Sequence, residues 1–360
     1  MNDTIDAIVD RLQQSLPDAL QWLLPIARRT LEYGFGPFNN GGGRFPWYGI
    51  LAALGIAAVA FVWGTRDKHD RTLAGFLRFC FPKEIYLDKN VWVDLKIGFM
   101  NPFIQPAVNI TWRITTVLIA SRITELLTLL LGPNTSPAAW TPTSVMICAV
   151  AFSLMSDFGY FLFHWLAHVF PPLWAIHKLH HSAEALTPLT AARVHPLERA
   201  VMGPFMAFTT ALLAGPIIYF YGGTTSPEAI FGLSMPGSLF FLAGHILHHS
   251  HVWVYFGPVI GRVIVSPVQH QIHHSSLPQH CDRNFAEHWA IWDTMFGTLY
   301  LPQGRETLKM GLTGYTKQPH TGLITALALP VWDSFKACLA LATRLARHYR
   351  LLQPPGAVRR

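Results

Sequence analysis

Long apolar stretches, separated by charged or histidine-rich segments, run through most of the chain. A helix needs about 20 apolar residues to cross a bilayer, and several stretches come close to that length. The sequence therefore predicts membrane spans at residues 45–63, 114–131, 144–163, 200–221 and 230–247. Short connectors at 132–143 and 222–228 join the last four spans in pairs. We expect an all-α integral membrane protein built on two transmembrane helical hairpins.

Three further segments are apolar but broken or amphipathic. Residues 97–110 contain Pro102 and Pro106, and because proline interrupts helices this segment is expected to be re-entrant or interfacial. Residues 322–342 contain Asp333 and Lys336, so a helix there is expected to lie on the membrane surface. An N-terminal helix, either interfacial or packed, is indicated by Leu12, Leu16, Leu20, Leu23 and Leu24.

The composition also indicates a membrane protein. Hydrophobic residues make up 51% of the chain and charged residues only 13%, against a charged share of roughly 25% in soluble domains. The formal net charge is +7, but the basic residues form no stripe interleaved with aromatic residues, so nucleic-acid binding is not expected. Basic residues gather at 66–89, whereas the connector 132–143 has no charged residue. Because positive residues favour the cytosolic side, both hairpins would carry their histidine-rich ends into the cytosol.

Ten of the eighteen histidines fall into four tight clusters beside the inner ends of these spans. Imidazoles three or four positions apart share one face of a helix, and neutral imidazole is the commonest metal ligand. Ten imidazoles exceed what one ion holds, so the pattern predicts two metal ions at the membrane surface. The predicted ligands are His164, His168, His177, His180, His181, His245, His249, His270, His273 and His274.

Other kinds of histidine-rich protein fit this pattern less well. A structural zinc site has four ligands and often uses thiolates, but the four cysteines here are far apart. A haem bundle needs only two facing axial histidines, and a zinc transporter would place its ligands in mid-membrane. A zinc protease would show HExxH, which does not occur. A pair of irons that activates dioxygen is the best match to the ligand number and position.

Two residues precede His164 on the same helical face, Asp157 by seven positions and Tyr160 by four. The Asp157 carboxylate could orient a ligand imidazole through its second nitrogen, as carboxylates behind metal ligands do. The alternative is a polar packing contact between helices.

The histidine clusters resemble the boxes of the fatty acid hydroxylase / sterol desaturase superfamily, which are membrane di-iron oxygenases. The stretch Asp157-Phe-Gly-Tyr-Phe-Leu-Phe-His164-Trp-Leu-Ala-His168 is similar to the first box, and His177-Lys-Leu-His180-His181 to the second. His245 and His249 match the third pair, and His270-Gln-Ile-His273-His274 matches the last box.

Two flanking segments resemble the same superfamily. Arg193-Val-His195-Pro196-Leu-Glu198 is similar to its RxHPxE segment, and the stretch from Asp282 and Asn284 to Gly297 is similar to its terminal signature. The resemblance covers residues 144–302. It implies three parts: a membrane region at 1–143 with interfacial helices and one or two spans, a histidine-box catalytic core at 144–305, and an interfacial helix with a basic tail at 306–360.

The resemblance implies that the ten histidines bind two iron ions, which zinc can replace on isolation, at the cytosolic face of the membrane (the inner membrane in a bacterium). The expected reaction is dioxygen-dependent hydroxylation of a C–H bond in a membrane lipid or sterol-like substrate. The electrons would come from an external donor such as a ferredoxin or a cytochrome b5. Besides the ligands, Asp157 and His195 are expected to act in catalysis. Roles next to the ligands or the substrate are expected for Tyr160, Arg193, Glu198, Asp282 and Asn284.

Two other functions stay open at this point. A desaturase of the same superfamily would share the ligand set, and a non-enzymatic metal-binding or transport protein would need no dioxygen. Among the other histidines, His248 points to a different helix side than His249 and is not expected to bind metal, while His69, His320 and His348 are expected to face solvent. The sequence leaves open the substrate, the oxidised position, the reductant, the native metal, the oligomeric state and the role of residues 1–143.

Overall fold

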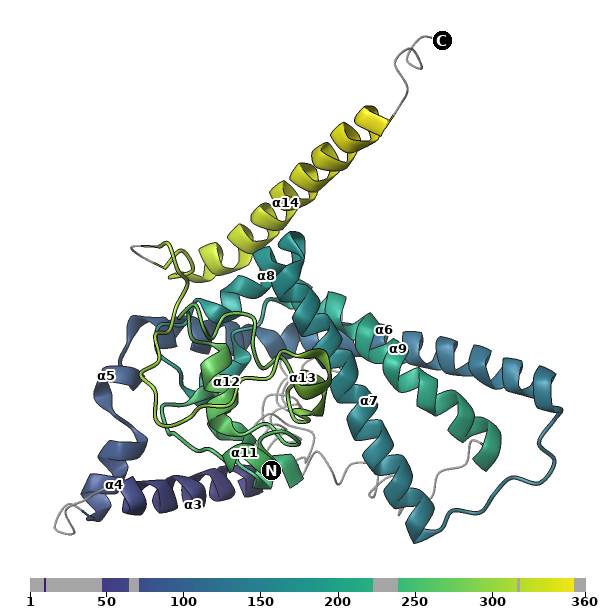
Figure 1. Cartoon of the computed structure of the whole chain (residues 1–360), viewed down its shortest axis with the longest axis horizontal. Coiled ribbons are helices and arrows are strands. Elements are labelled where there is room, and N and C mark those ends of the chain that lie inside the picture. Colours follow the sequence, from purple (N-terminus) through teal and green to yellow (C-terminus); the bar gives the residue numbers. More distant parts are fainter. Residues whose placement is uncertain (1–9, 11–46, 65–70, 223–238, 316–317, 353–360) are drawn as a thin grey trace.

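A computed structural model of the chain describes residue 10 and residues 47–64, 71–222, 239–315 and 318–352. These residues fold into helices and loops, and none of them forms a strand, so the expectation of an all-α protein is confirmed for the described part of the chain. The predicted N-terminal helix around Leu12–24 lies outside it. Figure 1 shows the helices, which are α3 (Trp47–Gly64), α4 (Leu73–Cys80), α5 (Lys83–Tyr86), α6 (Lys89–Leu131), α7 (Pro142–Val169), α8 (Pro171–His181), η3 (Pro188–Ala192), α9 (Pro196–Tyr221), η4 (His245–His249), α11 (Gly257–Ile260), α12 (Pro267–His273), α13 (Ile291–Phe296) and α14 (Leu323–Leu352).

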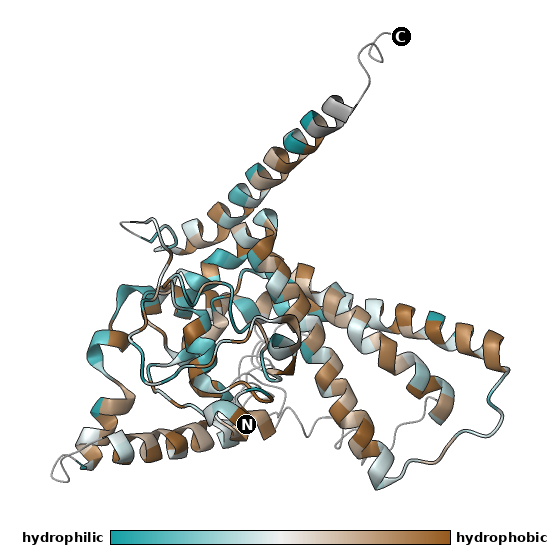
Figure 2. Cartoon of the chain, in the orientation of Figure 1, coloured by the Kyte–Doolittle hydropathy of each residue, from teal (hydrophilic) through white to brown (hydrophobic). Residues whose placement is uncertain are grey.

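Five of these helices are long and apolar enough to cross a membrane, as expected of an integral membrane protein. They are α3, the second half of α6 (Thr111–Leu131), α7, α9 and the first 25 residues of α14. In Figure 2, hydrophobic residues predominate along α3, α7 and α9. The first four helices lie where the sequence predicted spans. Half of the predicted span at 230–247 lies outside the described residues, and its last three residues begin η4. That α14 lies on the membrane surface stays a prediction.

One expectation about the prolines is wrong. Residues 97–110 do not form a separate re-entrant segment, because α6 continues through Pro102 and Pro106 as one 43-residue helix. Proline removes one backbone hydrogen bond from a helix, but most helical stability in a folded protein comes from packing rather than from local propensity. Here α6 packs along α9, and this contact holds the helix together across its prolines.

Two glycines allow α9 to lie close to both α6 and α7. A Cβ at Gly215 on α9 would lie 2.6 Å from Cβ and Cγ2 of Ile123 on α6. A Cβ at Gly159 on α7 would lie 2.4 Å from the Thr209 hydroxyl on α9. Thr124 of α6 also donates a hydrogen bond to the Gly215 carbonyl (3.1 Å). Small residues at a helix crossing permit this approach in membrane proteins, where packing drives association. The helix α9 is therefore the centre of the α6–α9–α7 layer.

The helix α14 joins this layer through α8. Lys178 on α8 pairs with Asp333 on α14 (2.6 Å), and Ala326 of α14 is fully buried. His195 lies just before α9 and reaches the carbonyl of Leu327 on α14 (3.0 Å). Beyond this contact α14 extends away from the rest of the molecule (Figure 1). The start of α14 thus belongs to the packed body that positions α8.

The glycine contacts predict that one alanine substitution destabilises the protein and that another stabilises it. In Gly215→Ala the new methyl group overlaps Ile123, and overpacking of this kind destabilises by about 1–3 kcal/mol. Gly55→Ala on α3 meets no atom within 4 Å, and removing a helical glycine stabilises by roughly 0.5–1 kcal/mol. Thermal unfolding in detergent, followed by circular dichroism, measures both. Equal melting temperatures for the two variants would contradict the close α6–α9 contact.

Candidate metal centre

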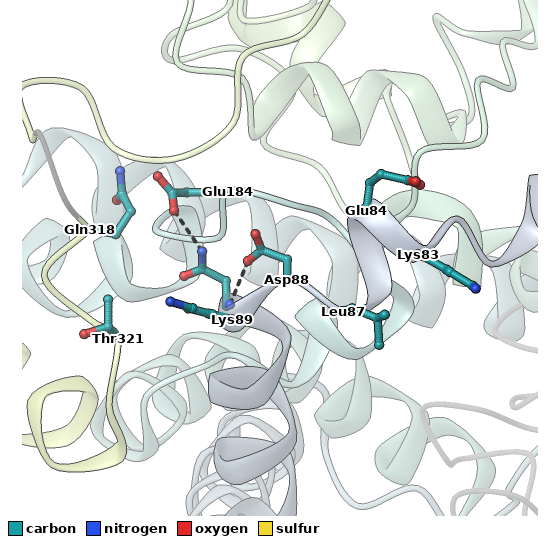
Figure 3. A pocket seen from close by; sticks show the side chains of 9 residues that line it. Lys83, Glu84, Leu87, Asp88, Lys89, Glu184, Gln318 and Thr321 are labelled. Atoms are coloured by element: carbon teal, nitrogen blue, oxygen red, sulfur yellow. Dashed lines mark hydrogen bonds between the residues drawn. The ribbon is translucent and has the colours of Figure 1, made fainter.

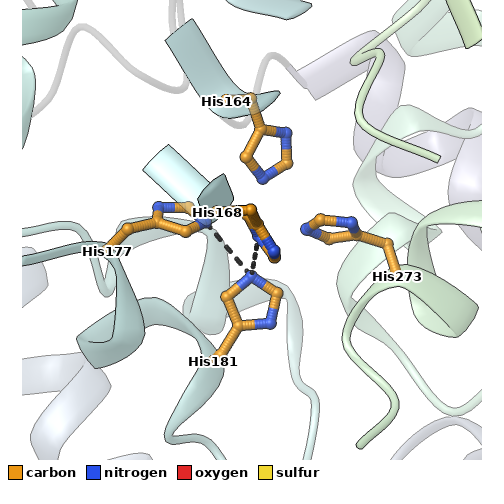
Figure 4. A group of neighbouring side chains, drawn as sticks. All are labelled: His164, His168, His177, His181 and His273. Atoms are coloured by element: carbon orange, nitrogen blue, oxygen red, sulfur yellow. Dashed lines mark hydrogen bonds between the residues drawn. The ribbon is translucent and has the colours of Figure 1, made fainter. Parts of the chain in front are cut away.

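Five histidines from three helices converge on one point. His164 and His168 come from α7, His177 and His181 from α8, and His273 from α12. Each offers one ring nitrogen, and these five atoms all lie within 4.8 Å of one another. Figure 4 shows the rings facing a common centre. We call these residues the five-histidine group.

Four further histidines form a second group beside the first. They are His180 from α8, His249 from η4, His270 from α12 and His274, which ends α12. Nε2 of His249 lies 3.2, 3.0 and 3.1 Å from Nε2 of His180, His270 and His274, respectively. We call these residues the four-histidine group.

The HxxHH spacing explains how two neighbouring groups are made from the same helices. In α8, His177 and His181 are four positions apart and point into the five-histidine group, whereas the intervening His180 points into the other. In α12 the arrangement is reversed, because His270 and His274 enter the four-histidine group and His273 enters the five-histidine group. Positions i and i+4 lie about 40° apart around a helix, while i+3 lies on the other side of i. Each HxxHH motif therefore supplies histidines to both groups. Where the groups meet, the rings of His181 and His274 stack (4.7 Å between centroids).

Backbone carbonyls fix the orientation of two rings of the five-histidine group. Nδ1–H of His164 donates to the carbonyl of Phe285 (2.7 Å), and Nδ1–H of His273 donates to the carbonyl of Arg283 (2.8 Å). A carbonyl only accepts, so the proton is on Nδ1 and Nε2 carries a lone pair. Within the described residues, neither Nε2 has a hydrogen-bond partner although both are buried.

Carboxylates fix the orientation of two more rings of the five-histidine group. Nδ1–H of His177 donates to Glu198 (2.7 Å), and Nδ1–H of His168 donates to Asp282 (3.2 Å). Both carboxylates were expected beside the ligands, and both lie there. Such outward partners fix the tautomer of a metal-ligating histidine and raise its basicity. Four Nε2 lone pairs of the five-histidine group therefore point inward.

This arrangement fits a bound cation and fits little else. Nε2 of His181 lies 3.1 Å from Nε2 of both His168 and His177. Two nitrogens that bind one ion at about 2.1 Å are about 3.0–3.4 Å apart at octahedral or tetrahedral angles. One proton per pair cannot satisfy a ring of inward lone pairs, whereas one metal ion satisfies all of them. The donor set, imidazole nitrogen throughout, suits iron, zinc, copper and nickel.

Burial keeps these rings in the form that binds metal. Removal from water lowers the pKa of His273 to about 3, and burial together with neighbouring imidazoles lowers the pKa values of His181, His270 and His274 well below the ordinary value of 6.5. A neutral imidazole has the free lone pair that a metal requires. An ion that binds here therefore does not have to displace a positive charge from these rings.

His245 is the one predicted ligand that joins neither group. The expected α-helix would have placed His245 and His249 on one face, but these residues form the 3-10 helix η4. With three residues per turn, positions i and i+4 point about 120° apart. His245 instead lies near His248 (4.6 Å between rings) and forms a separate cluster with Glu287 and His288. His248 belongs to none of the three clusters, as expected.

Asp157 does not orient a ligand, so the packing alternative is the one that the structure favours. Its carboxylate accepts hydrogen bonds from the backbone N–H groups of His288 (2.9 Å) and Trp289 (3.0 Å). The ring of His288 lies 3.4 Å away, and the pKa of His288 is raised because Asp157 and Glu287 outweigh its burial. The carboxylate thus anchors the loop before α13 to α7.

His195 also lies apart from both groups. Its Nδ1 accepts the backbone N–H of Leu197 (3.1 Å) and caps α9, and its Nε2–H donates to Leu327. Asp157 and His195 both lie outside the two histidine groups, and their expected part in catalysis stays a prediction. Tyr160 does lie against the five-histidine group, with its ring 5.2 Å from that of His164.

The side chains of Arg193 and Asn284 are buried and form hydrogen bonds with backbone groups, rather than facing an open site. Arg193 is fully buried and pairs with Asp94 (3.0 Å). It also donates to the carbonyls of Leu179 and His320 and to Ser182. Asn284, with a φ of +57°, bonds to the backbone of Gln269 and Tyr300. The expected exposure of His320 is wrong, since it is buried beside this network.

Some residues that build the site carry no local signal in the sequence. The carbonyls of Phe285 and Arg283 are backbone atoms, so no residue type marks them. Asp293 is buried and accepts the N–H groups of Phe285 (2.8 Å) and Ala286 (2.9 Å), and burial raises its pKa to about 6. It thereby holds the Phe285 carbonyl against His164. The sequence marked Asp293 only as part of the terminal signature.

A cavity of about 280 Å³ opens beside the five-histidine group. Its walls include the ligand candidates His168, His181 and His273, together with Trp174 and Asp282. A small molecule can therefore reach the inward face of these rings.

A second, polar cavity of about 690 Å³ lies elsewhere, between α5, the start of α6 and the chain near Glu184 and Gln318 (Figure 3). No histidine lines it, and its lysines and carboxylates are of opposite charge; in it Asn90 donates to Glu184 (2.9 Å). It is distinct from the metal centre.

Comparison with known proteins agrees with this geometry. The model of the fatty acid hydroxylase family matches residues 149–298, a range that contains every histidine of both groups. Residues 149–298 are thus similar to the fatty acid hydroxylase family. No solved structure matches the chain.

The similar curated proteins are named as enzymes that act on lipids. An alkylglycerol monooxygenase of Xenopus tropicalis is 29% identical over 195 residues, which are 53% of this chain and 39% of the relative. An ornithine lipid hydroxylase of Rhizobium tropici is 27% identical over 178 residues, 49% of this chain and 48% of the relative. The human alkylglycerol monooxygenase is 29% identical over 142 residues, 39% of this chain and 28% of the relative. The chain thus spans less than half the length of each.

Loss of the carboxylate behind His177 should weaken metal binding. In Glu198→Ala the Nδ1–H of His177 loses its acceptor, and loss of such a partner typically lowers metal affinity by about 10–100-fold. The matched control is Glu306→Ala, whose carboxylate binds His280, a histidine outside all three clusters. Competition with a chelator, read by elemental analysis, measures both. Equal retention of metal in the two variants would contradict the role of Glu198.

Loss of Arg193 should unfold the protein rather than weaken substrate binding. Arg193→Ala leaves the buried Asp94 without its ion-pair partner, and breaking a buried pair costs about 3–5 kcal/mol. The expected result is a large fall in melting temperature, measured in detergent. A variant that melts normally but binds lipid poorly would restore the substrate role that the sequence suggested.

Proposed function

We propose that this protein is a dioxygen-dependent hydroxylase of a membrane lipid, with two iron ions held by the histidine groups. The observation that carries the proposal is the convergence of nine imidazole nitrogens in two adjacent groups. Five imidazoles would hold one ion and four the other. The family of residues 149–298 and the hydroxylase names of the relatives support the same reaction.

The chain's own residues would supply the geometry of this reaction. When bound, the iron pair supplies the power to oxidise an unactivated C–H bond with dioxygen. Phe285, Arg283, Glu198 and Asp282 hold the rings in their ligating tautomer. Burial of the groups excludes bulk water from the reacting atoms, which protects the oxidation from side reactions. The cavity beside His168 and Asp282 would admit dioxygen to the rings.

An apolar cavity supports a lipid as the substrate. It has a volume of about 270 Å³ and lies between α3 and η4, next to the segment that carries His249. Ala53, Leu54 and Ala57 of α3 face Ile246 and Leu247 of η4 across it. Because α3 is long enough to cross the membrane, a hydrocarbon chain could enter here directly from the bilayer. A head group is not specified, and a sterol-like ring would meet the same apolar walls.

The proposal also includes the topology. The second half of α6 and α7 would form one hairpin, and α9 would begin the other, with both histidine groups at the cytosolic ends. The uncharged connector 132–143 and the basic segment 66–89 support this orientation. The electrons would come from an external donor of the ferredoxin or cytochrome b5 type that docks on the basic cytosolic face.

The test is lipid analysis of cells that express the chain under isotopically labelled dioxygen. The wild-type chain and His280→Gln, a change outside both groups, should give a lipid alcohol that carries the label. His273→Ala and His270→Ala, one from each group, should abolish this product because each removes a ligand. The variants are first compared with wild type in membrane level and melting temperature.

Two outcomes would contradict the proposal and assign the chain to another function. A new double bond without label would assign the chain to the desaturases of the superfamily. Metal flux across vesicles, with no dioxygen uptake in the presence of lipid and reductant, would assign it to metal transport.

A further inference from the structure

A third cluster of metal-binding side chains lies apart from the two histidine groups. It comprises His245, the first residue of η4, and two residues of the loop between α12 and α13, Glu287 and His288. Nε2 of His245 lies 3.9 Å from Oε1 of Glu287, and Nδ1 of His288 lies 3.9 Å from Oε2 of the same carboxylate. The rings of His245 and His288 stack at 4.8 Å.

We propose that His245, Glu287 and His288 form a separate site for a single divalent transition-metal ion, such as Zn²⁺. Two histidines and one carboxylate are a ligand set that zinc uses in proteins, with space for water in the remaining positions. Atoms that bind one ion at about 2.1 Å can lie up to about 4.2 Å apart. Both 3.9 Å separations meet that limit, so each histidine lies within reach of an ion that the Glu287 carboxylate binds.

The site is distinct from the four-histidine group because of the geometry of η4. His245 and His249 point in different directions from this 3-10 helix, as its three-residue turn requires. The ring of His248 lies between the two sites, 4.6 Å from the ring of His245 and stacked at 5.3 Å on that of His270. An ion held by His245 would therefore be additional to the pair.

Charge and access both favour a cation here. The Glu287 carboxylate is part of the cluster, and Oδ1 of Asp157 lies 3.4 Å from Nδ1 of His288. Two carboxylates beside two imidazoles favour a positive charge between them. The side chains of His245, Glu287 and His288 are 21%, 33% and 22% exposed, so an ion can enter from outside. Asp157, held by two backbone N–H groups, adds its negative charge beside the same ring nitrogen of His288 that faces Glu287.

An ion at this position would clamp together segments that build the main centre. His245 lies on η4, which carries the ligand candidate His249. Glu287 and His288 follow Phe285, whose carbonyl orients His164. Through Asp157 the cluster also contacts α7. The ion would position the ligands of the pair and would not touch the substrate.

The test measures metal content in the full-length protein, saturated with Zn²⁺ in lipid nanodiscs and then freed of loosely bound ion. Glu287→Gln is nearly isosteric and keeps the fold, and His288→Ala removes a second ligand. Each should contain about one zinc per chain less than wild type. The matched control Glu306→Gln, which changes a carboxylate outside all three clusters, should retain the wild-type content. The readout is the difference between variants, so it does not depend on whether the pair hydroxylates a lipid.

Three results would overturn the proposal. Wild type, Glu287→Gln and His288→Ala could contain equal zinc. His245→Ala alone could lose zinc, which would make His245 a ligand of the pair. Glu287→Gln could lose two or more ions, which would mean that Glu287 only supports the main centre.

Discussion

Neutral imidazoles whose lone pairs face one another about 3 Å apart in a dry pocket repel unless a cation lies between them. Much of the described structure serves to impose this arrangement. The helices α7, α8 and α12 bring the rings together, and close glycine contacts fix α9 against both α6 and α7. Arg193 joins α6, α8 and the segment before α14 through a fully buried set of hydrogen bonds. The fold thus positions the rings so that a single cation can contact several of them.

The sequence predicted what depends on local periodicity. The spacing of His177, His180 and His181 predicted a helix with its imidazoles on one face, and α8 is such a helix, but its rings enter both groups. The spacing could not predict which histidine joins which group, because that depends on how α8 and α12 face each other. Glu198 and Asp282 were expected next to the ligands or the substrate because they stand in segments that resemble the superfamily. The two carbonyls that orient His164 and His273 could not be predicted from the sequence, because every residue has a backbone carbonyl and no residue type marks the ones that accept these hydrogen bonds.

The wrong expectations share one cause, which is that tertiary packing overrode a local rule. Prolines did not break α6, because α9 supports the helix along its length. A four-residue spacing did not bring His245 to His249, because the backbone there winds into a 3-10 helix. Asp157 shares a helical face with His164, yet its carboxylate is taken by backbone N–H groups of a distant loop. The spacing of residues predicts which face of a helix a side chain lies on, whereas tertiary packing determines which residues it contacts.

The two histidine groups differ in how firmly the protein holds them. Four rings of the five-histidine group are fixed by outward hydrogen bonds to Phe285, Arg283, Glu198 and Asp282. In the four-histidine group, Nδ1 of His270 is buried without a hydrogen-bond partner among the described residues, while its Nε2 lies 3.0 and 3.2 Å from Nε2 of His249 and His274, respectively. Outward hydrogen bonds raise the basicity of a ligand and reduce the entropy it loses on binding. Four rings of the five-histidine group are therefore preorganised in a way that His270 is not. The open cavity is lined by His168, His181 and His273 of that group and by His274 of the other, so both groups border it.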